Sequence, residues 1–180
     1  MRLLLHCCCA PCSAPILEWL ESNNITPTLL FYNPNIYPEK EYMIRKQEIV
    51  RYAEKLGLEI IDADYNHAEW LNDVKGHETD KERGPRCRIC FYQRLQRTAK
   101  EAAEKGFDTI ATTLASSRWK KIDEINAAGE DSVKPYPSVS FWAKNWRKDG
   151  LQLRRSQLLK ENGFYNQTYC GCEFSIRKCD

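Results

Sequence analysis

The sequence predicts an α/β fold built on a mainly parallel sheet. Short apolar segments with the length of buried strands alternate with stretches that have helical spacing. The four segments expected to be strands are residues 3–6, 28–32, 58–62 and 108–113. Strands that alternate with helices pair in parallel, and parallel sheets place ligands beyond the carboxyl ends of their strands. We therefore expect functional residues in the loops that follow these strands.

The first half of the chain supplies three of the expected strands. After the first strand, Ser13 can cap a helix and Pro15 suits its first turn, so we expect a helix to begin there. The second strand ends at residues 33–35, because the sequence Asn-Pro-Asn cannot continue a sheet. A long helix over residues 38–56 then ends at Gly57 and leads into the third strand.

The second half supplies the fourth strand and the remaining helices. The expected helices and their glycine stops are residues 68–74, a helix from about Arg86 to Gly106, residues 121–128 before Gly129, and residues 151–162 before Gly163. Residues 131–150 are rich in Pro and Trp and are expected to be irregular. We expect one domain over residues 1–180. Residues 1–115 form its α/β core with the cysteine loop and the CxxC pair, and residues 116–180 form a helical or irregular C-terminal segment.

The composition is that of a globular protein without a membrane segment. Hydrophobic residues make up 42% and charged residues 29% of the 180 residues, a balance that can bury a substantial core. No apolar run approaches the roughly 20 residues that a membrane crossing needs. The apolar run at the start of the chain reaches the cysteines too early to be the apolar stretch of a signal peptide. We therefore expect a cytoplasmic protein, whose reduced thiols favour metal or redox chemistry over a disulfide scaffold.

Nine cysteines are the most informative feature of the chain. Three tight clusters hold all but Cys179: Cys7-Cys8-Cys9-Ala10-Pro11-Cys12, Cys87-Arg88-Ile89-Cys90 and Cys170-Gly171-Cys172. Cys87 and Cys90 are spaced to lie on one side of the first turn of a helix, whose N-terminus favours thiolate. Two thiolates from the first cluster would complete a four-cysteine metal site.

Four thiolates suit either zinc or an iron–sulfur cluster. The side chains of neighbours such as Cys8 and Cys9 tend to diverge, which favours the separated corners of a cubane cluster over one tetrahedral ion. The alternative is that these cysteines are small buried apolar residues. Cys170 and Cys172 can close a small strained ring across a glycine, which favours a redox-active pair over a second metal half-site or two unrelated thiols.

Basic residues interleaved with aromatic residues point to RNA, whereas the net charge of +2 alone does not. The residues expected to contact RNA are Trp146, Arg147, Lys148, Arg154 and Arg155. A second small group places Arg118, Lys120 and Lys121 around Trp119. The alternative is a solvated basic face over tryptophans that belong to the core.

Several blocks of the sequence resemble the QueH-type epoxyqueuosine reductases, over nearly the whole chain. The matching blocks are residues 6–12 (HCCCAPC), 31–38 (FYNPNIYP), 41–42 (EY), 86–90 (RCRIC), 94–95 (RL), 106–108 (GFD), 112–114 (TTL), 156 (S), 160–161 (KE) and 165–172 (YNQTYCGC). The resemblance implies reduction of epoxyqueuosine to queuosine in the wobble position of tRNA, the last step of queuosine biosynthesis. It also implies a three-layer HUP-like fold related to adenine nucleotide α-hydrolases. The cysteine loop takes the place of their phosphate-binding loop, so ATP binding is not expected.

The resemblance also assigns roles to the cysteines. The implied roles are a 4Fe–4S cluster on Cys8, Cys9, Cys87 and Cys90, and a redox-active disulfide between Cys170 and Cys172. Some relatives are expected to hold an additional iron beside the cluster, with a carboxylate after the first cysteine block. This chain has no acidic residue before Glu18, so either Cys12 substitutes or that site is absent or built elsewhere.

The substrate implied by the resemblance is the tRNA anticodon loop that carries epoxyqueuosine, with an external electron donor. A tyrosine near the mouth of the site could supply a proton, and Tyr32, Tyr37 and Tyr169 are the candidates. Two other functions stay open at this point. One is a zinc-stabilised tRNA-binding module without catalysis, and the other is an iron–sulfur thiol oxidoreductase that acts on a protein partner.

Overall fold

The computed structural model describes residues 1–176 and contains a five-stranded sheet with the order β3-β2-β1-β4-β5. The strands are β1 (Leu3–His6), β2 (Thr28–Phe31), β3 (Ile60–Asp62), β4 (Thr109–Thr112) and β5 (Ser140–Phe141). Every neighbouring pair is parallel, and β1 is the central strand between β2 and β4. The α/β class and the parallel sheet predicted from the sequence are therefore confirmed.

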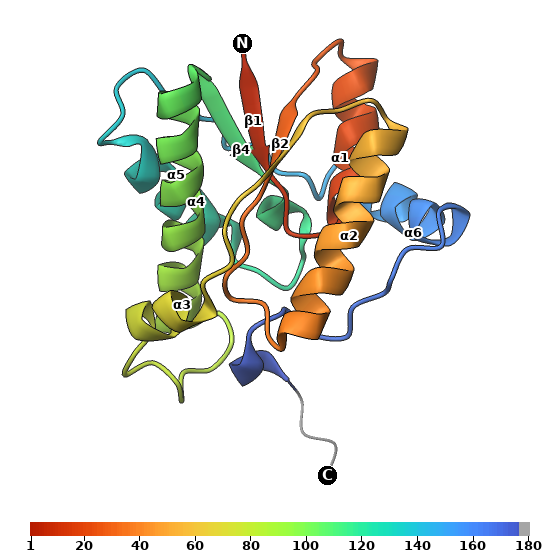
Figure 1. Cartoon of the computed structure of the whole chain (residues 1–180). Helices are drawn as coiled ribbons and strands as arrows, with labels where there is room; N and C mark the ends of the chain where they lie inside the picture. Colours follow the sequence, from red (N-terminus) through yellow and green to blue (C-terminus); the bar gives the residue numbers. More distant parts are fainter. Residues whose placement is uncertain (177–180) are drawn as a thin grey trace.

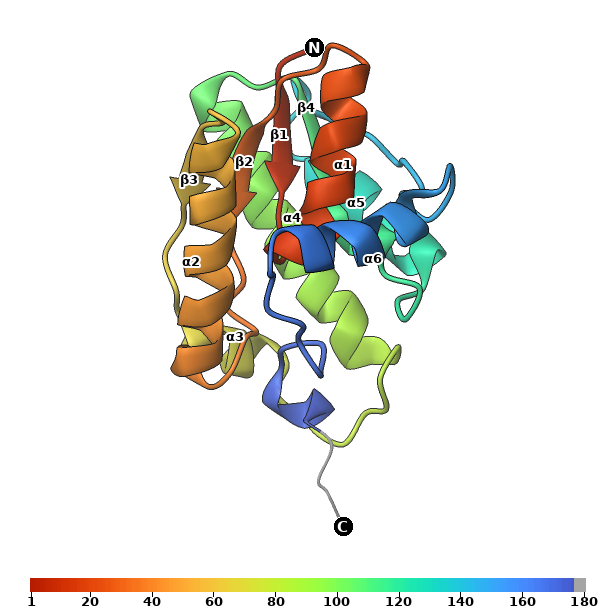
Figure 2. The ribbon, with the colours of Figure 1, turned by 90° about the vertical axis from the view of Figure 1, so that its right-hand side faces the viewer.

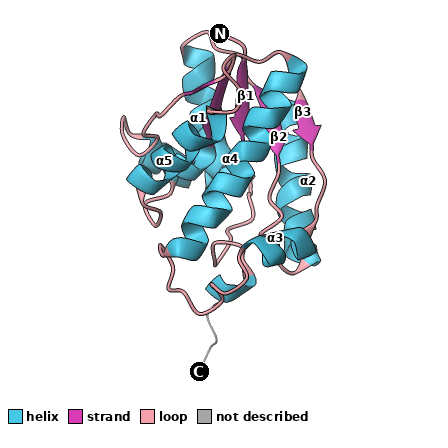
Figure 3. Cartoon of the chain, turned by 90° about the vertical axis from the view of Figure 1, so that its left-hand side faces the viewer, coloured by secondary structure: helices cyan, strands magenta, loops and turns pink. Residues whose placement is uncertain are grey.

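Helices cover both faces of the sheet, which gives the molecule three layers (Figure 1). The helices are α1 (Ala10–Ser22), α2 (Glu39–Lys55), α3 (His67–Asp73), α4 (Pro85–Lys105), α5 (Ile122–Val133) and α6 (Leu151–Glu161). On one face α1 packs against α2, and α6 packs across α1 (Figure 2). On the other face α4 and α5 pack together (Figure 3). No helix among residues 1–176 has the length and apolar character that a membrane crossing needs.

The central strand is buried on both of its faces. Leu3 and Leu5 pack in the core shared with α1 and α2, whereas Leu4 packs with Ala99 and Ala102 of α4. Side chains alternate between the two faces along a strand, so a strand covered on both sides must be apolar throughout. This requirement explains the unbroken apolar run at the start of the chain.

Two predicted helix boundaries and one segment predicted to be irregular are wrong. α1 begins at Ala10 with Cys9 as its N-cap, and Ser13 lies inside the helix, where its hydroxyl donates to the Cys9 carbonyl at 2.8 Å. Gly129 does not end a helix but lies within α5, and this position requires glycine because a Cβ there would meet the Phe141 ring at 2.4 Å. The segment expected to be irregular contains β5, which pairs with β4. Contacts with distant segments override the local signal in the last two cases, whereas Ser13 bonds within its own helix.

The carboxyl ends of β1, β2 and β4 lie at one edge of the sheet. The short 3-10 helix η1 (Thr113–Ser116) follows β4 at this edge. The last described segment leaves α6 and returns to the same edge, where it forms the 3-10 helix η2 (Glu173–Ser175), drawn in dark blue in Figures 1 and 2. Loops from the start, the middle and the end of the chain therefore meet in one place.

Candidate active site

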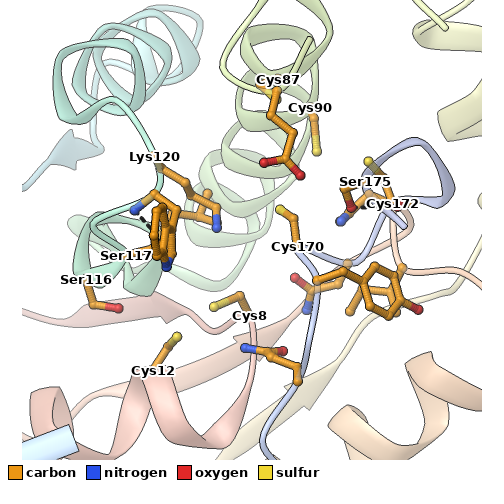
Figure 4. Close-up of a pocket in the computed structure, with 18 of the residues that line it drawn as sticks. Cys8, Cys12, Cys87, Cys90, Ser116, Ser117, Lys120, Cys170, Cys172 and Ser175 are labelled. Atoms are coloured by element: carbon orange, nitrogen blue, oxygen red, sulfur yellow. Dashed lines mark hydrogen bonds between the residues drawn. The ribbon is translucent and has the colours of Figure 1, made fainter. Parts of the chain in front are cut away.

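A cavity of about 480 Å³ lies at the carboxyl edge of the sheet. Cysteines from all three clusters line it: Cys8, Cys12, Cys87, Cys90, Cys170 and Cys172 (Figure 4). Cavities of roughly 300–1,000 Å³ are typical of small-molecule and cofactor sites. Thiols that are far apart in the sequence therefore face one ligand-sized space.

The first cluster brings three thiols together at the start of α1. The Sγ atoms of Cys8, Cys9 and Cys12 all lie within 4.8 Å of one another, and those of Cys8 and Cys9 are 3.8 Å apart. Cys12 lies one helical turn after the N-cap Cys9. Its thiol is therefore on the same side of α1 as the loop that holds Cys8 and Cys9. The Thr113 hydroxyl donates to Cys8 Sγ at 3.3 Å, and the Gln167 side-chain amide donates to Cys9 Sγ at 3.0 Å.

Cys9 and Cys12 differ in their affinity for a proton. Hydrogen bonds from Cys8 and then Cys9 lower the pKa of Cys12 well below its usual value, and the nearby charge of Arg155 acts in the same direction. Hydrogen bonds with Cys12 and Cys8, together with burial, raise the pKa of Cys9. The group therefore favours a thiolate on Cys12 that its neighbours stabilise as donors.

Cys87 and Cys90 lie on the first two turns of α4, at the spacing that places both on one side. The N–H of Arg83 donates to Cys87 Sγ at 3.3 Å, and an Arg94 nitrogen lies 4.0 Å from Cys90 Sγ. The sequence predicted that the helix N-terminus would favour thiolates here. Burial is the larger effect, and it raises the pKa of both thiols. A metal that binds these two thiols must therefore displace their protons.

His6 and Cys7 support the site from the core and do not line the cavity. Nε2 of His6 lies 3.1 Å from the Tyr32 carbonyl, which can only accept, so Nε2 carries the proton and Nδ1 accepts from the Thr112 hydroxyl at 2.8 Å. Burial, and next the charge of Arg94, lowers the pKa of His6 to about 3. Burial raises the pKa of Cys7 to about 12. Both side chains are therefore neutral parts of the core.

Two buried arginines fix the loops around the cavity. Arg94 donates to the side-chain oxygen of Asn33, whose amide donates to the Cys7 carbonyl at 2.9 Å. Arg86 donates to three backbone carbonyls within residues 77–80, and its guanidinium lies 4.9 Å from the centre of the Phe174 ring. These contacts join the ends of β1 and β2, and they join the loop before α4 to the C-terminal segment.

The lining of the cavity is strongly cationic. It includes Arg45, Arg83, Arg86, Arg94, Arg118, Lys120, Lys121 and Arg155, with Glu82 as the single carboxylate among the described lining residues. Burial opposes the charge on Lys120, but the negative charge of the nearby Cys170 and Cys8 thiolates raises its pKa to about 12. The ammonium group is therefore charged at neutral pH. A cavity with this charge attracts anionic ligands and stabilises thiolates.

α2 holds the CxC segment over the cavity. Arg45 is buried and donates to the carbonyls of Cys170 at 3.0 Å and Tyr169 at 3.2 Å. The guanidinium is paired with Glu41 one turn earlier, at 2.7 Å. One buried charge pair thus fixes two consecutive carbonyls of the segment that carries the third cysteine cluster.

The glycine between Cys170 and Cys172 has a backbone that other residues rarely adopt. Gly171 has a φ of 131°, and its carbonyl accepts from the Tyr37 N–H at 2.9 Å. The sulfur of Cys170 points into the cavity, whereas Cys172 is buried beside Ser175 (Figure 4). Both cysteines are free thiols in the structure. Their predicted role as a redox pair stays a prediction.

The three tyrosines proposed as proton donors lie in different places. Tyr32 packs in the core on the α4 side of the sheet, where the Arg97 guanidinium lies 5.3 Å from its ring centre. Tyr37 is exposed and stacks on His67. Tyr169 lines the cavity and donates its hydroxyl to the Tyr37 carbonyl, and burial raises its pKa to about 12. Tyr169 is thus the one of the three that lines the cavity, with its phenol protonated at neutral pH.

Two of the residues expected to contact RNA are engaged within the protein. Trp146 is only 1% exposed and belongs to the core. Arg154 pairs with Glu18 at 2.7 Å and with Glu161 at 2.8 Å, which joins α6 to α1. These contacts are what the alternative interpretation, a basic face over core tryptophans, predicts.

The other three residues expected to contact RNA are divided between the cavity and the surface. Arg155 lines the cavity. Arg147 donates to the Lys120 carbonyl at 2.6 Å, and Lys148 is exposed outside the described lining. The structure therefore brings Arg155 to the cysteines, and the contribution of the stretch to RNA binding stays a prediction.

Two side chains of the site, Arg45 and Gln167, were given no role from the sequence. Thr113 was expected only from its place at the end of a strand, and Lys120 only as part of the second basic group. Gln167 lies just before the CxC pair, so its position could have indicated a role. Arg45 follows Glu41 at the spacing of an ordinary surface ion pair. Its burial depends on the return of the C-terminal segment, which no local pattern indicates.

The donor set fits a thiolate-ligated metal centre. Cys8, Cys9 and Cys12 form a group that can hold a metal, and Cys87 and Cys90 lie across the same cavity. Soft thiolate donors suit iron–sulfur clusters and zinc. The sequence left Cys12 open, either as one of the candidates for the four-cysteine site or as a ligand of an additional iron, and the structure places it with the two proposed cluster ligands of the first block.

Comparisons with known proteins agree on one family. A family model described as "Epoxyqueuosine reductase QueH" matches residues 3–178 of the chain. The chain is 46% identical over 176 residues to the epoxyqueuosine reductase QueH of Histophilus somni, covering 98% of the chain and 72% of that relative. It is 45% identical to the protein of the same name from Acinetobacter baylyi, covering 98% of the chain and 81% of the relative.

A more distant relative also matches nearly the whole chain. The chain is 34% identical over 177 residues to the epoxyqueuosine reductase QueH of Thermotoga maritima, and this match covers 97% of the chain and 90% of the relative. The similarity therefore extends over the sheet, the CxxC helix and the C-terminal segment together.

Proposed function

The chain belongs to the epoxyqueuosine reductase QueH family, and on this basis we propose that it reduces epoxyqueuosine to queuosine in tRNA at the cysteine-lined cavity. The observation that carries the proposal is that thiols from all three cysteine clusters line one cavity. Family membership disfavours both alternatives, the non-catalytic zinc module and the thiol oxidoreductase that acts on a protein partner. The enzyme is thus an oxidoreductase with a nucleic acid substrate.

The reaction defines what the site must supply. Conversion of an epoxide to an alkene consumes two electrons and two protons and releases the oxygen as water. A dithiol that becomes a disulfide gives up two electrons and two protons, so one dithiol balances one epoxide. Cys170 and Cys172 are the proposed dithiol, and an external electron donor must then reduce their disulfide before the next turnover.

We assign a 4Fe–4S cluster to Cys8, Cys9, Cys87 and Cys90. Such a cluster supplies electrons one at a time at a potential that its surroundings tune. Cys12 remains available to an additional iron, in the role that the resemblance left open. Two of these ligands are buried, since Cys9 and Cys90 are 1% and 7% exposed, and Cys8 and Cys87 are partly buried.

Other side chains position the substrate and hold protons. Lys120 keeps its charge in the cavity, where it can stabilise negative charge that develops on the epoxide oxygen. Tyr169 is protonated at neutral pH and is the proposed proton donor. The cationic lining suits the phosphates beside an unpaired anticodon base.

A compartment that keeps thiols reduced, such as the cytoplasm, suits this chemistry.

Conversion of the modified nucleoside tests the function. Anaerobically purified protein is incubated with tRNA that carries epoxyqueuosine and with a chemical reductant, and the tRNA is digested to nucleosides for mass analysis. We expect a product that is lighter by one oxygen atom and corresponds to queuosine. Cys87→Ser should abolish the conversion, whereas Cys7→Ala, which changes a core thiol outside the cavity, should retain it. Iron-loaded protein that leaves epoxyqueuosine intact would contradict the proposal.

A further inference from the structure

Trp119 is the exposed tryptophan of this chain, and it lies on the wall of the cavity. Trp119 is 62% exposed, whereas Trp70 and Trp146 are each 1% exposed, and the remaining two tryptophans are partly buried. All five tryptophans fall within the described residues. A large exposed aromatic residue beside a functional cavity is a candidate contact for a ligand.

The loop that carries Trp119 is fixed on both sides. Arg83, from the loop before α4, donates through Nε to the Trp119 carbonyl at 2.8 Å. Arg147 donates to the Lys120 carbonyl at 2.6 Å, and Gln152 of α6 donates to the Ser116 carbonyl at 2.6 Å. Three segments therefore hold this loop by its carbonyls. The indole ring is exposed, and the backbone that carries it is held by these hydrogen bonds. A ligand that binds the ring therefore does not have to order the loop first.

The charge around the ring is positive. The Arg118 guanidinium lies 4.8 Å from the centre of the Trp119 ring, and Arg83, Arg118 and Lys121 are all exposed. Arg83 uses only Nε on the loop in the described contacts, so its terminal nitrogens can bind a further oxygen. An exposed aromatic ring with arginines beside it is the arrangement with which proteins bind unpaired nucleotides, through stacking on the base and charge on the phosphate. The Arg118 guanidinium lies over one face of the indole, which leaves the other face for a base.

We infer that Trp119 is a stacking platform for an unpaired nucleobase next to the modified nucleotide, with Arg118 and Arg83 binding the flanking phosphates. This inference rests on the proposed function, because it requires an anticodon loop whose modified base enters the cavity. The neighbouring base then remains outside, at the rim, where Trp119 can receive it. This rim is separate from Trp146 and Arg154, whose side chains are engaged in the core and in ion pairs.

The test compares Trp119→Ala with Trp119→Phe, which retains an aromatic face. Tyr92→Ala is the matched control, because Tyr92 is an exposed aromatic residue of α4 outside the described cavity lining. For an anticodon stem-loop RNA that carries epoxyqueuosine, we expect Trp119→Ala to raise Kd and KM about 5- to 150-fold, the range for the loss of one base stack. We expect kcat and iron content to change much less. Trp119→Phe should recover most of the affinity, and Tyr92→Ala should match the wild type.

A salt titration tests the phosphate contacts. Arg118→Ala should reduce the slope of log affinity against log salt by about 0.7, the value for one single-strand phosphate. Wild-type conversion with unchanged RNA affinity in Trp119→Ala would overturn the inference and leave the proposed function intact. Absence of both conversion and RNA binding in the wild type would instead refute the proposed function. A rate loss seen only with a protein electron donor, at unchanged RNA affinity, would assign the ring to that protein and overturn the inference.

Discussion

Adjacent cysteines differ sharply in what they can do. Cys7 is enclosed in the core, where burial raises its pKa to about 12, whereas Cys8 lines the cavity and accepts a hydrogen bond from Thr113. At the end of an extended strand, consecutive side chains point to opposite sides, so one thiol must enter the core when its neighbour faces the cavity. The division of neighbouring thiols between core and cavity follows from the geometry of the strand.

Gly171 is the residue on which the placement of the CxC pair depends most. Its φ of 131° disfavours any side chain, and an added Cβ would lie 3.1 Å from Ile36 and 3.2 Å from Arg45. We expect Gly171→Ala to cost about 1–3 kcal/mol in the docking of this segment, through strain and displaced neighbours. Alkylation of the buried Cys172, followed by mass spectrometry, should accelerate, and turnover should fall.

Gly163→Ala is the matched control for this prediction. Gly163 also has a positive φ, of +62°, but nothing lies within 4 Å of the place that a Cβ would take, so the variant adds strain without a collision. It should leave the alkylation rate of Cys172 near that of the wild type. Equal rates in Gly171→Ala and the wild type would show that the segment does not need this backbone.

At the scale of elements, α2 is the support for the C-terminal segment. Glu41, Arg45 and Glu48 lie on one face of this helix, at spacings of four and three residues. Glu41 accepts from the Tyr165 hydroxyl at 2.9 Å, and Glu48 accepts from the Tyr165 N–H at 2.6 Å. In the sequence these residues look like an ordinary solvated face, because the segment that covers them comes more than a hundred residues later.

The pH dependence of stability should report the burial of Glu48. Burial raises its pKa above the ordinary value of 4.5, against the opposing hydrogen bond from Tyr165. The folded protein therefore holds this proton more tightly than the unfolded chain does. Its contribution to stability is present below about pH 4.5 and is lost as the pH rises through the folded-state pKa.

Glu48→Gln retains an oxygen that can accept from Tyr165 and removes the buried charge. Thermal unfolding should show a midpoint at pH 7 equal to or above that of the wild type, with a smaller decline between acidic and neutral pH. Glu54→Gln, an exposed change on the same helix, should follow the wild-type curve. A Gln variant that is less stable at neutral pH and keeps the wild-type slope would contradict this account.

At the scale of the whole molecule, local patterns predicted the sheet and the edge at which function lies. Apolar segments marked β1 to β4, and the rule for parallel sheets placed the cysteine loop, Asn33 and Thr113 at one edge. The two-residue β5 was too short to show a pattern. The start of α1 was misplaced because Ser13, a residue typical of helix caps, bonds backward to the Cys9 carbonyl from inside the helix.

The parts of the site that the sequence could not predict depend on contacts between distant segments. Arg45 reaches the carbonyls of Tyr169 and Cys170, and Gln167 reaches the thiol of Cys9. Similarly, Arg147 was expected to contact RNA, but it donates to the Lys120 carbonyl in the loop that carries Trp119. Each of these roles is set by the path of the C-terminal half across the cavity, and a local motif contains no information about that path.

The central claim is that thiols from two distant segments form one iron–sulfur centre. Iron content per chain in anaerobically purified protein, measured for the wild type and for single serine variants, tests it most directly. The account predicts that Cys87→Ser and Cys90→Ser lose most of the iron and the cluster absorbance, while Cys12→Ser keeps the cluster. Retention of iron in Cys87→Ser, with its loss in Cys12→Ser, would place the metal on the group formed by Cys8, Cys9 and Cys12 and contradict the proposed centre.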